Sequence, residues 1–375
     1  MHRLVLLVVL AAPSAQAQWQ IQTSNTTADL RGIHSVGNGV AWASGTNGTV
    51  LRTEDGGYVW QTCAIPPGAE KLDFRGIQAF DSNTAIVMSS GKGDLSRLYK
   101  TTDGCHTWKL IFTNPDKDGF FDALYFDRGK WGWLLGDPVH GMFALFATDD
   151  SAKTWIRQIN DGLKADPRTQ GAFAASNTTL IGQYVAAKFV SGGIGGANFY
   201  VSWMVHNTCL DCSAEESEEY KAGKKNSWTH ERVPIGNDTE SSGVFSVAQK
   251  QYLPGNNEDN WIIAAVGGDY AKPDDSTATA AYSKDGGKTW TAAQTPPHGY
   301  RSSVAYDPTL KLWITVGPNG TDVSTDDGRN WRAIHPSAAL HEPPDADRNW
   351  NALSLPFVAG PKGRIGKLVE AALGK

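Results

Sequence analysis

A phrase of eight residues recurs along the chain and constrains its fold more than any other feature. Each copy reads Ser/Thr-x-Asp-x-Gly-x-Thr-Trp or a close variant of it. The five well-preserved copies are Thr53–Trp60, Thr101–Trp108, Thr148–Trp155, Ser283–Trp290 and Ser324–Trp331, and a worn copy without the Asp ends at Ser227-Trp228. Recurrence of one short unit along a whole chain indicates a repeat architecture rather than two unrelated domains.

The physical logic of this phrase, known as the Asp-box or BNR repeat, is local. A strand ends at the Ser or Thr, and the chain reverses through the Asp and the Gly. The carboxylate accepts hydrogen bonds from backbone N–H groups of the turn, Gly supplies positive φ angles, and the Trp opens the next strand. We therefore expect a turn-locking role, not a catalytic one, for Asp55, Trp60, Asp103, Trp108, Asp150, Trp155, Asp285, Trp290, Asp326 and Trp331.

Short apolar stretches before each box predict the strands of seven units. The predicted first strands are Leu30–Val36, Phe74–Phe80, Phe120–Phe126, Gly171–Ala175, Gly243–Val247, Tyr300–Tyr306 and Trp350–Leu355. Four antiparallel strands per unit, repeated about every 40 to 70 residues, are typical of β-propeller blades. The 40 Gly and 14 Trp, against only 4 Met, agree with an all-β chain rich in tight turns.

The two ends of the chain predict how the ring closes. The seventh unit has no box and no fourth strand, whereas the stretch Trp19–Thr23 is a strand without a unit. Pairing of these two parts would remove exposed sheet edges. The sequence therefore predicts one seven-bladed propeller over residues 18–375, with insertions at 207–225 in the fourth blade and 269–277 in the fifth.

Residues 1–17 are typical of a cleavable signal peptide. Leu4–Ala12 is apolar but too short to span a bilayer, and Ala15-Gln16-Ala17 fits a cleavage site. An uncleaved membrane anchor is the alternative interpretation. We expect a periplasmic or secreted protein with no membrane span after cleavage.

Export permits disulfides among the four cysteines. Cys63 and Cys105 occupy similar places in successive repeats and are candidates for a bridge between neighbouring units. Cys209 and Cys212 lie in the polar insertion, where a local disulfide is favoured over a redox pair or half of a zinc site. No second Cys pair or nearby His pair completes a zinc set, and no glycine-rich dinucleotide phrase is present. The sequence predicts no metal and no cofactor.

Several phrases outside the boxes carry a family resemblance. They are Arg31–Ile33, Asp73–Ile77, Gly136–Pro138, Tyr300–Val304 and Gly317–Gly320. With these phrases the mature chain resembles the photosystem II stability/assembly factor-like family of Asp-box propellers. The resemblance implies a seven-bladed, extracytoplasmic propeller, and the photosynthetic members act as assembly chaperones that hold a partner protein.

The boxes are also similar to those of sialidases and related exo-glycosidases. Those enzymes need three arginines, a Tyr nucleophile with an assisting carboxylate, and an Asp acid. The Arg-Ile-Pro phrase that usually opens a sialidase is not found, and seven units replace six. An exo-glycosidase acting on a charged sugar, and a carbohydrate-binding propeller without turnover, remain alternative hypotheses.

The propeller geometry sorts the candidate site residues. First strands line the central channel, and the loops from fourth to first and from second to third strands share one face. The residues predicted at this channel face are Arg31, Arg75, Asp122, Asp137, His140, Tyr300, Arg301 and Asn351, with Lys92, Asp94 and Lys272 in nearby loops. Three arginines near one axis would attract a carboxylate, a sugar acid or an acidic peptide terminus. Alternatively, Arg31 and Arg75 pair with Asp122 and carbonyls and fill a narrow channel.

A catalytic interpretation has weak support. Asp122 and Tyr300 are the candidates for an acid and a nucleophile, but Tyr needs a close base to attack and is more often a wall residue. The formal net charge of −5 argues against a general nucleic-acid binder. We expect an exported, monomeric, non-enzymatic scaffold that binds a protein or envelope component, with a glycan as the other possible ligand.

Overall fold

The computed structural model describes residues 18–127, 129–183, 186–204, 226–251, 261–336 and 342–369. The predicted signal peptide 1–17, the insertion 207–225 and the pair Cys209 and Cys212 lie outside these residues. Within the described ranges, the helices are the single turns η1 (Gly93–Leu95) and η2 (Asp161–Leu163). None of the helices described is long and apolar enough to cross a membrane.

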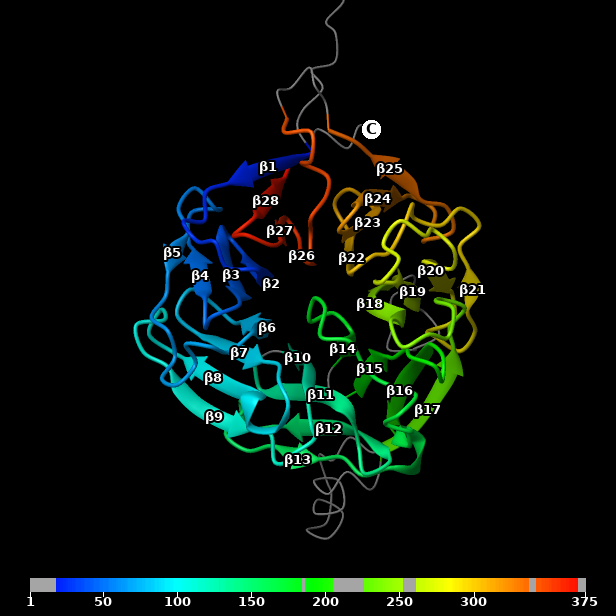
Figure 1. Ribbon diagram of the computed structural model, residues 1–375, viewed down its shortest axis with the longest axis horizontal. Coiled ribbons are helices and arrows are strands. Elements are labelled where there is room, and N and C mark those ends of the chain that lie inside the picture. Colours follow the sequence, from blue (N-terminus) through cyan, green and yellow to red (C-terminus); the bar gives the residue numbers. More distant parts are fainter. Residues whose placement is uncertain are drawn as a thin grey trace, which may run out of the picture.

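The described strands form seven four-stranded antiparallel sheets around one axis, as the repeat predicts (Figure 1). Blades 1 to 3 comprise β2–β5 (Leu30–Gly37, Val40–Gly45, Val50–Thr53, Gln61–Thr62), β6–β9 (Phe74–Ala79, Ala85–Ser89, Arg97–Thr101, Lys109–Thr113) and β10–β13 (Phe121–Asp127, Trp131–Val139, Met142–Thr148, Ile156–Arg157). Blades 4 to 6 comprise β14–β17 (Leu180–Gln183, Ala186–Val190, Asn198–Met204, Asn226–Arg232), β18–β21 (Ser242–Gln251, Trp261–Asp269, Ala280–Ser283, Thr291–Ala292) and β22–β25 (Ser303–Asp307, Leu312–Gly317, Gly320–Ser324, Arg332–Ile334).

Blade 7 is built from both ends of the chain, which confirms the predicted closure. Its strands are β26 (Ala352–Ser354), β27 (Phe357–Ala359), β28 (Ile365–Leu368) and β1 (Trp19–Gln22). β1 pairs antiparallel with β28, with Trp19 opposite Leu368. The Trp60 indole N–H donates to Gln22 Oε1 at 2.9 Å, so the first box also ties blade 1 to this closing sheet.

Each box aspartate accepts hydrogen bonds from its own turn. In the second copy, the Thr107 hydroxyl and backbone N–H donate to Asp103 at 2.6 and 3.0 Å, and Thr101 donates at 2.9 Å. The Thr107 hydroxyl, the Thr107 N–H and Thr101 together lower the pKa of Asp103 to about 2. Cys105 and Ala152, which replace the second Gly, adopt left-handed φ angles of 65° and 69°.

The prediction for the first strand of blade 4 is wrong. The inner strand is β14 (Leu180–Gln183), and Gly171 is joined only to Gly192 by an isolated bridge. The stretch 171–179, named here the channel segment, instead loops toward the centre of the ring in Figure 1. A short apolar run does not by itself distinguish a strand from a buried loop.

Candidate functional site at the channel face

A bulge at the same place in four inner strands selects the side chains that face the channel. In β2, β6, β10 and β18, the pairing with the second strand skips one residue near the start of the strand. A bulge changes the direction in which the side chain of the extra residue points. The skipped residues are Arg31, Arg75, Asp122 and Phe245.

The channel segment crosses the ring and bonds to three other blades. Asn177 makes a paired contact with the Leu124 backbone, accepting from its N–H at 2.7 Å and donating to its carbonyl at 2.9 Å. The Ser176 hydroxyl donates to the Ser302 carbonyl at 2.8 Å, and the Thr178 and Ser246 hydroxyls are 2.7 Å apart. These contacts anchor the channel segment at the centre of the ring, where it forms a plug (Figure 1).

Arg31 and Arg75 are brought together by Asp73. The Asp73 carboxylate lies 3.3 Å from Arg31 Nε and 2.8 Å from Arg75 Nε, and Arg75 Nη1 also donates to the Ala174 carbonyl at 3.4 Å. The two arginine side chains are 32% and 30% exposed. Two guanidinium charges thus share one carboxylate at a half-exposed surface, which leaves net positive charge for an incoming anion. The ion pairs expected with Asp122 are thus made with Asp73, while Arg75 contacts a carbonyl as expected and remains within electrostatic range of Asp122.

Asp122 and Asp137 form a carboxyl pair beside the plug. Asp122 is 1% exposed, and its Oδ2 has no hydrogen-bond partner among the described residues. Burial raises the pKa of Asp122 well above its usual range, Asp137 raises it further, and Arg75 opposes both. Asp137 Oδ1 accepts the Ala172 N–H at 3.0 Å, and burial nevertheless raises the pKa of Asp137 to about 6.

Asp137→Asn is expected to stabilise the protein at neutral pH. The folded-state pKa of about 6 exceeds the usual 3.8, so between these values the unfolded chain loses a proton that the folded protein keeps. Folding stability therefore falls as pH rises through this window, and a penalty of about 3 kcal/mol persists above it. Asn can still accept the Ala172 N–H but carries no charge. Urea unfolding should show the gain near neutral pH and none below about pH 4.

The exposed Asp149→Asn change is the control for this pH dependence. It removes one carboxylate from the same blade without touching the plug. A loss of stability in Asp137→Asn at neutral pH, or a gain that does not vary with pH, would contradict the argument.

Arg301 does not join the other two arginines, so the prediction of a three-arginine mouth is wrong. Its side chain is 0% exposed and pairs with the buried Asp322, to which Nε donates at 2.8 Å. Nη1 donates to the Tyr300 carbonyl at 2.8 Å, and His298 Nδ1 lies 2.9 Å from the other oxygen of Asp322. This network holds blade 6 together, and within it the Arg301 guanidinium is inaccessible to a ligand, whereas the His298 side chain is 37% exposed.

Tyr300 belongs to an aromatic group. It is 7% exposed and meets Phe245 edge-on at 4.8 Å between ring centroids, and burial raises its pKa. Phe173 of the channel segment stacks on Phe245 at 3.9 Å. Tyr270, 53% exposed, lies edge-on to Phe173 at 6.5 Å. Phe173 precedes Ala174, the contact of Arg75, so aromatic surface adjoins the arginine pair.

The remaining predicted residues are peripheral or structural. Asn351 is half-buried and donates to the Leu30 carbonyl at 2.8 Å, joining blades 7 and 1. Lys92 pairs with Asp118 at 2.7 Å, with both side chains exposed, and the exposed Asp94 lies 3.7 Å from the half-buried Arg97. His140 and Lys272 are also exposed.

Sequence reasoning missed Asp73 and the three aromatic residues Phe173, Phe245 and Tyr270 as members of the site. The sequence contains an indication for Asp73, because this residue stands directly before a predicted first strand and two residues from Arg75. It also contains an indication for Phe245, which is the third residue of a predicted first strand. Phe173 lay in a stretch assigned to the wrong element, and Tyr270 in a loop.

Comparisons with known proteins point to one family. A family described as "Photosynthesis system II assembly factor YCF48" matches residues 11–219, more than half of the chain. The photosystem II assembly lipoprotein Ycf48 of a Picosynechococcus species is 25% identical over 344 residues, covering 90% of this chain and 82% of the relative.

Solved structures agree with the fold. A structure of YCF48 bound to D1 peptide has a TM-score of 0.58 at 17% identity, covering 95% of this chain and 99% of that one. YCF48 from Cyanidioschyzon merolae gives 0.57 at 16%, covering 94% and 99%. An ancestral GH74 enzyme gives 0.54 at 12%, covering 93% of this chain and 46% of the enzyme, which is a likeness of fold alone. With its seven closed blades and this match over more than half of its length, the chain belongs to the YCF48 family of photosystem II assembly factor propellers.

Proposed function

We propose that this protein is an exported, non-catalytic scaffold that holds a protein partner at its channel face. The observation that carries the proposal is the half-exposed Arg31 and Arg75 pair, fixed by the single carboxylate of Asp73. A surface with two guanidinium groups and one balancing charge favours a carboxylate ligand. A structure of a related propeller bound to a D1 peptide supports the proposal that the carboxylate belongs to a peptide.

The neighbouring aromatic side chains suggest which kind of side chain lies next to the carboxylate in the bound peptide. Tyr270 is exposed and Phe173 half-buried, and both lie on the side of the channel segment next to Ala174, the contact of Arg75. Rings at such a position can pack against an apolar side chain of the same peptide. We infer an acidic side chain or a free peptide carboxyl terminus on the arginines, with an apolar side chain beside it.

A hydrolytic function fits the same residues poorly. The Asp122 carboxyl is buried beside the plug, and Tyr300 is buried against Phe245, with the pKa of each group raised by burial. A general acid and a nucleophile both need access to substrate. Residues 1–17 as a cleaved signal peptide would place the monomer outside the cytoplasm, in keeping with a lipoprotein relative.

The double variant Arg31→Glu/Arg75→Glu is expected to weaken peptide binding at least about tenfold, because it removes two charge-assisted contacts. Peptides with free carboxyl termini, selected from a library on the wild-type protein, serve as probes in fluorescence anisotropy. The carboxyl-terminal amides of the same peptides should bind the wild type more weakly if the terminus is what the arginines hold.

The control variant Arg329→Glu/Arg332→Glu makes the same charge change at exposed positions of blade 6. Equal binding by the channel-face variant and the wild type would refute the proposal. Turnover of any fluorogenic glycoside that is lost on Asp122→Asn would replace it with the glycosidase hypothesis.

A further inference from the structure

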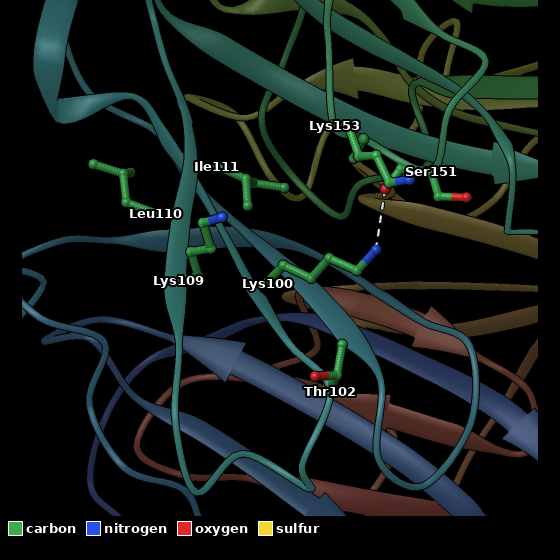
Figure 2. Close-up of a pocket in the computed structure, with 8 residues that line it drawn as sticks. Lys100, Thr102, Lys109, Leu110, Ile111, Ser151 and Lys153 are labelled. Carbon is green, nitrogen blue, oxygen red and sulfur yellow. Dashed lines mark hydrogen bonds between the residues drawn. The ribbon is translucent and has the colours of Figure 1, made fainter.

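A cleft lies between blades 2 and 3 (Figure 2). Its volume is about 320 Å³. The third and fourth strands of blade 2 form one side, and the box turn of blade 3 forms the other. The lining residues are Lys100, Thr102, Lys109–Ile111 and Ser151–Lys153.

Three ammonium groups surround this cleft without a matching carboxylate. Among the side chains that the structure describes, none places a carboxylate oxygen within 4 Å of Lys100, Lys109 or Lys153. Asp150 lies within electrostatic range of Lys100 but is engaged by its own turn. Thr154 N–H and Lys153 N–H donate to Asp150 Oδ1 at 3.0 and 2.8 Å, and the Thr154 hydroxyl donates to Oδ2 at 2.7 Å.

Lys100 is held in place at the floor of the cleft. Its Nζ donates to the Ser151 carbonyl at 3.0 Å, an interaction drawn in Figure 2. Burial and then the charge of Lys153 lower the pKa of Lys100, and Asp150 only partly offsets them. A partly buried cation repelled by a second cation is stabilised when an anion enters between them.

The strand beside the cleft is an open sheet edge. β9 (Lys109–Thr113) is the outermost strand of blade 2. It has five residues, whereas the outermost strands β5, β13 and β21 have two each and β17 has seven, and a bulge at Ile111 interrupts its pairing with β8. Leu110 is 46% exposed on it, and Ile111 is half-buried. Long apolar edges attract additional strands, and natural proteins usually shorten or cover them. β9 therefore offers backbone pairing next to a positively charged cleft.

We propose that an extended, acidic segment of a partner protein adds to the free edge of β9 and places a carboxylate in the cleft among Lys100, Lys109 and Lys153. Strand addition supplies affinity through main-chain hydrogen bonds, and the lysines select acidic sequences. This second surface is separate from the channel face, and it lets one propeller hold two segments at once.

The probe is a short fluorescein-labelled poly-glutamate peptide, and its binding to the full mature chain is measured by anisotropy at low ionic strength. Lys100→Gln/Lys109→Gln/Lys153→Gln is expected to weaken binding at least about tenfold. The triple Arg variant at these positions should retain it. Lys284→Gln/Lys311→Gln/Lys362→Gln removes the same charge from exposed positions elsewhere and should bind as the wild type does.

Amide hydrogen exchange separates strand addition from general attraction of anions. In the Arg31→Glu/Arg75→Glu background, the peptide should slow exchange within Lys109–Thr113. Equal weakening in both Gln variants, competition by inorganic phosphate as effective as that by the peptide, or unaltered exchange in β9 would each overturn the proposal. The same comparison is made in the Arg31→Glu/Arg75→Glu background, which removes acidic-peptide binding at the channel face. A loss of at least about tenfold on the triple Gln change in that background is then due to the cleft alone, which distinguishes failure here from failure at the channel face.

Discussion

Replacing Asp322 with Asn is expected to lower the free energy of unfolding by about 3–5 kcal/mol, because it removes the ion-pair partner of the buried Arg301 guanidinium. Asp347 remains within electrostatic range of Arg301 but makes no ion pair with it. Arg301 is fully buried and Asp322 is 2% exposed. Burial opposes ionisation of Asp322, yet the His298 hydrogen bond and the Arg301 charge outweigh it and hold the pKa of Asp322 below its usual value. Urea unfolding followed by tryptophan fluorescence measures the loss.

The double variant Arg301→Met/Asp322→Asn provides the control for this pair. It removes both charges, so it should be less destabilised than Asp322→Asn alone, even though fewer native contacts remain. A loss below about 1 kcal/mol in the single variant would mean that the pair is solvated and that Arg301 is available to a ligand after all.

The misplacement of Arg301 comes from a shift of one residue that the sequence does not reveal. Tyr300-Arg301 resembles Leu30-Arg31, and this similarity predicts that both arginines face the channel. The backbone N–H groups of Arg301 and Leu30, however, donate to equivalent glycine carbonyls of the preceding blade, Gly267 and Gly360. Arg301 thus takes the place of buried Leu30, because a one-residue slip turns a side chain to the other face of a sheet.

The blades themselves were predictable because each carries its own local signals. Alternating strands and the box turn recur within each unit, and β1 paired with β28 as the unmatched ends required. The channel segment has no such local signal. Its conformation depends on Leu124, Ser246 and Ser302, which lie 50 to more than 120 residues away along the chain, and no periodicity encodes those contacts.

The site was predictable to the same extent. The topology predicts a channel-face position for Arg31, Arg75 and Asp137, since blade order and strand position fix the face of each strand end. The sequence does not show which charged side chains contact one another, because those contacts depend on side-chain geometry. Asp73 reaches both arginines from the connection before β6, while Asp122 lies buried next to Asp137.

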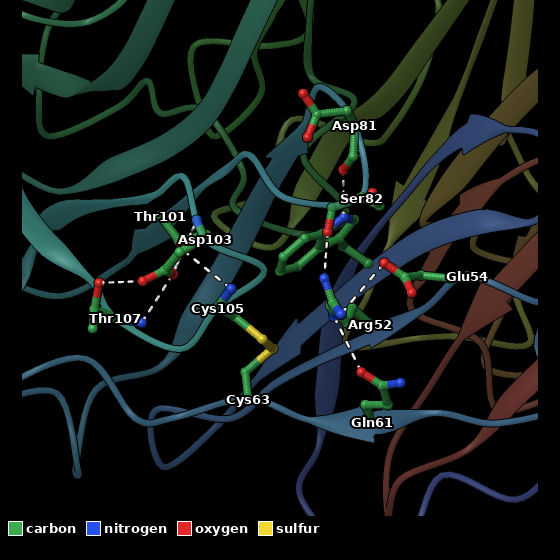
Figure 3. The surroundings of a disulfide bond; sticks show 11 residues. Arg52, Glu54, Gln61, Cys63, Asp81, Ser82, Thr101, Asp103, Cys105 and Thr107 are labelled. Carbon is green, nitrogen blue, oxygen red and sulfur yellow. Dashed lines mark hydrogen bonds and ion pairs between the residues drawn. A yellow bond between two sulfur atoms is a disulfide. The ribbon is translucent and has the colours of Figure 1, made fainter.

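Removing the disulfide between Cys63 and Cys105 is expected to lower the free energy of unfolding by about 4 kcal/mol, from the loop-closure entropy of a 42-residue separation. The bond joins the end of β5 in blade 1 to the box of blade 2 (Figure 3). It is formed between two residues predicted to bridge neighbouring units. Reduction, or Cys63→Ser/Cys105→Ser, followed by urea unfolding measures the cost.

The same disulfide should affect peptide binding at the channel face, because the connection that begins at Cys63 ends at Asp73, which pairs with Arg31 and Arg75. Without the disulfide this connection is less constrained and Asp73 holds the two arginines less firmly. The Ser variant should therefore also bind channel-face peptides more weakly. Cys63→Ser/Cys105→Gly separates two effects, since Gly at the left-handed φ of 65° should recover about 1 kcal/mol of stability without restoring the bridge. If that variant regains stability while peptide binding stays weak, the bridge positions Asp73. If binding never changes, blades 1 and 2 hold Asp73 without it.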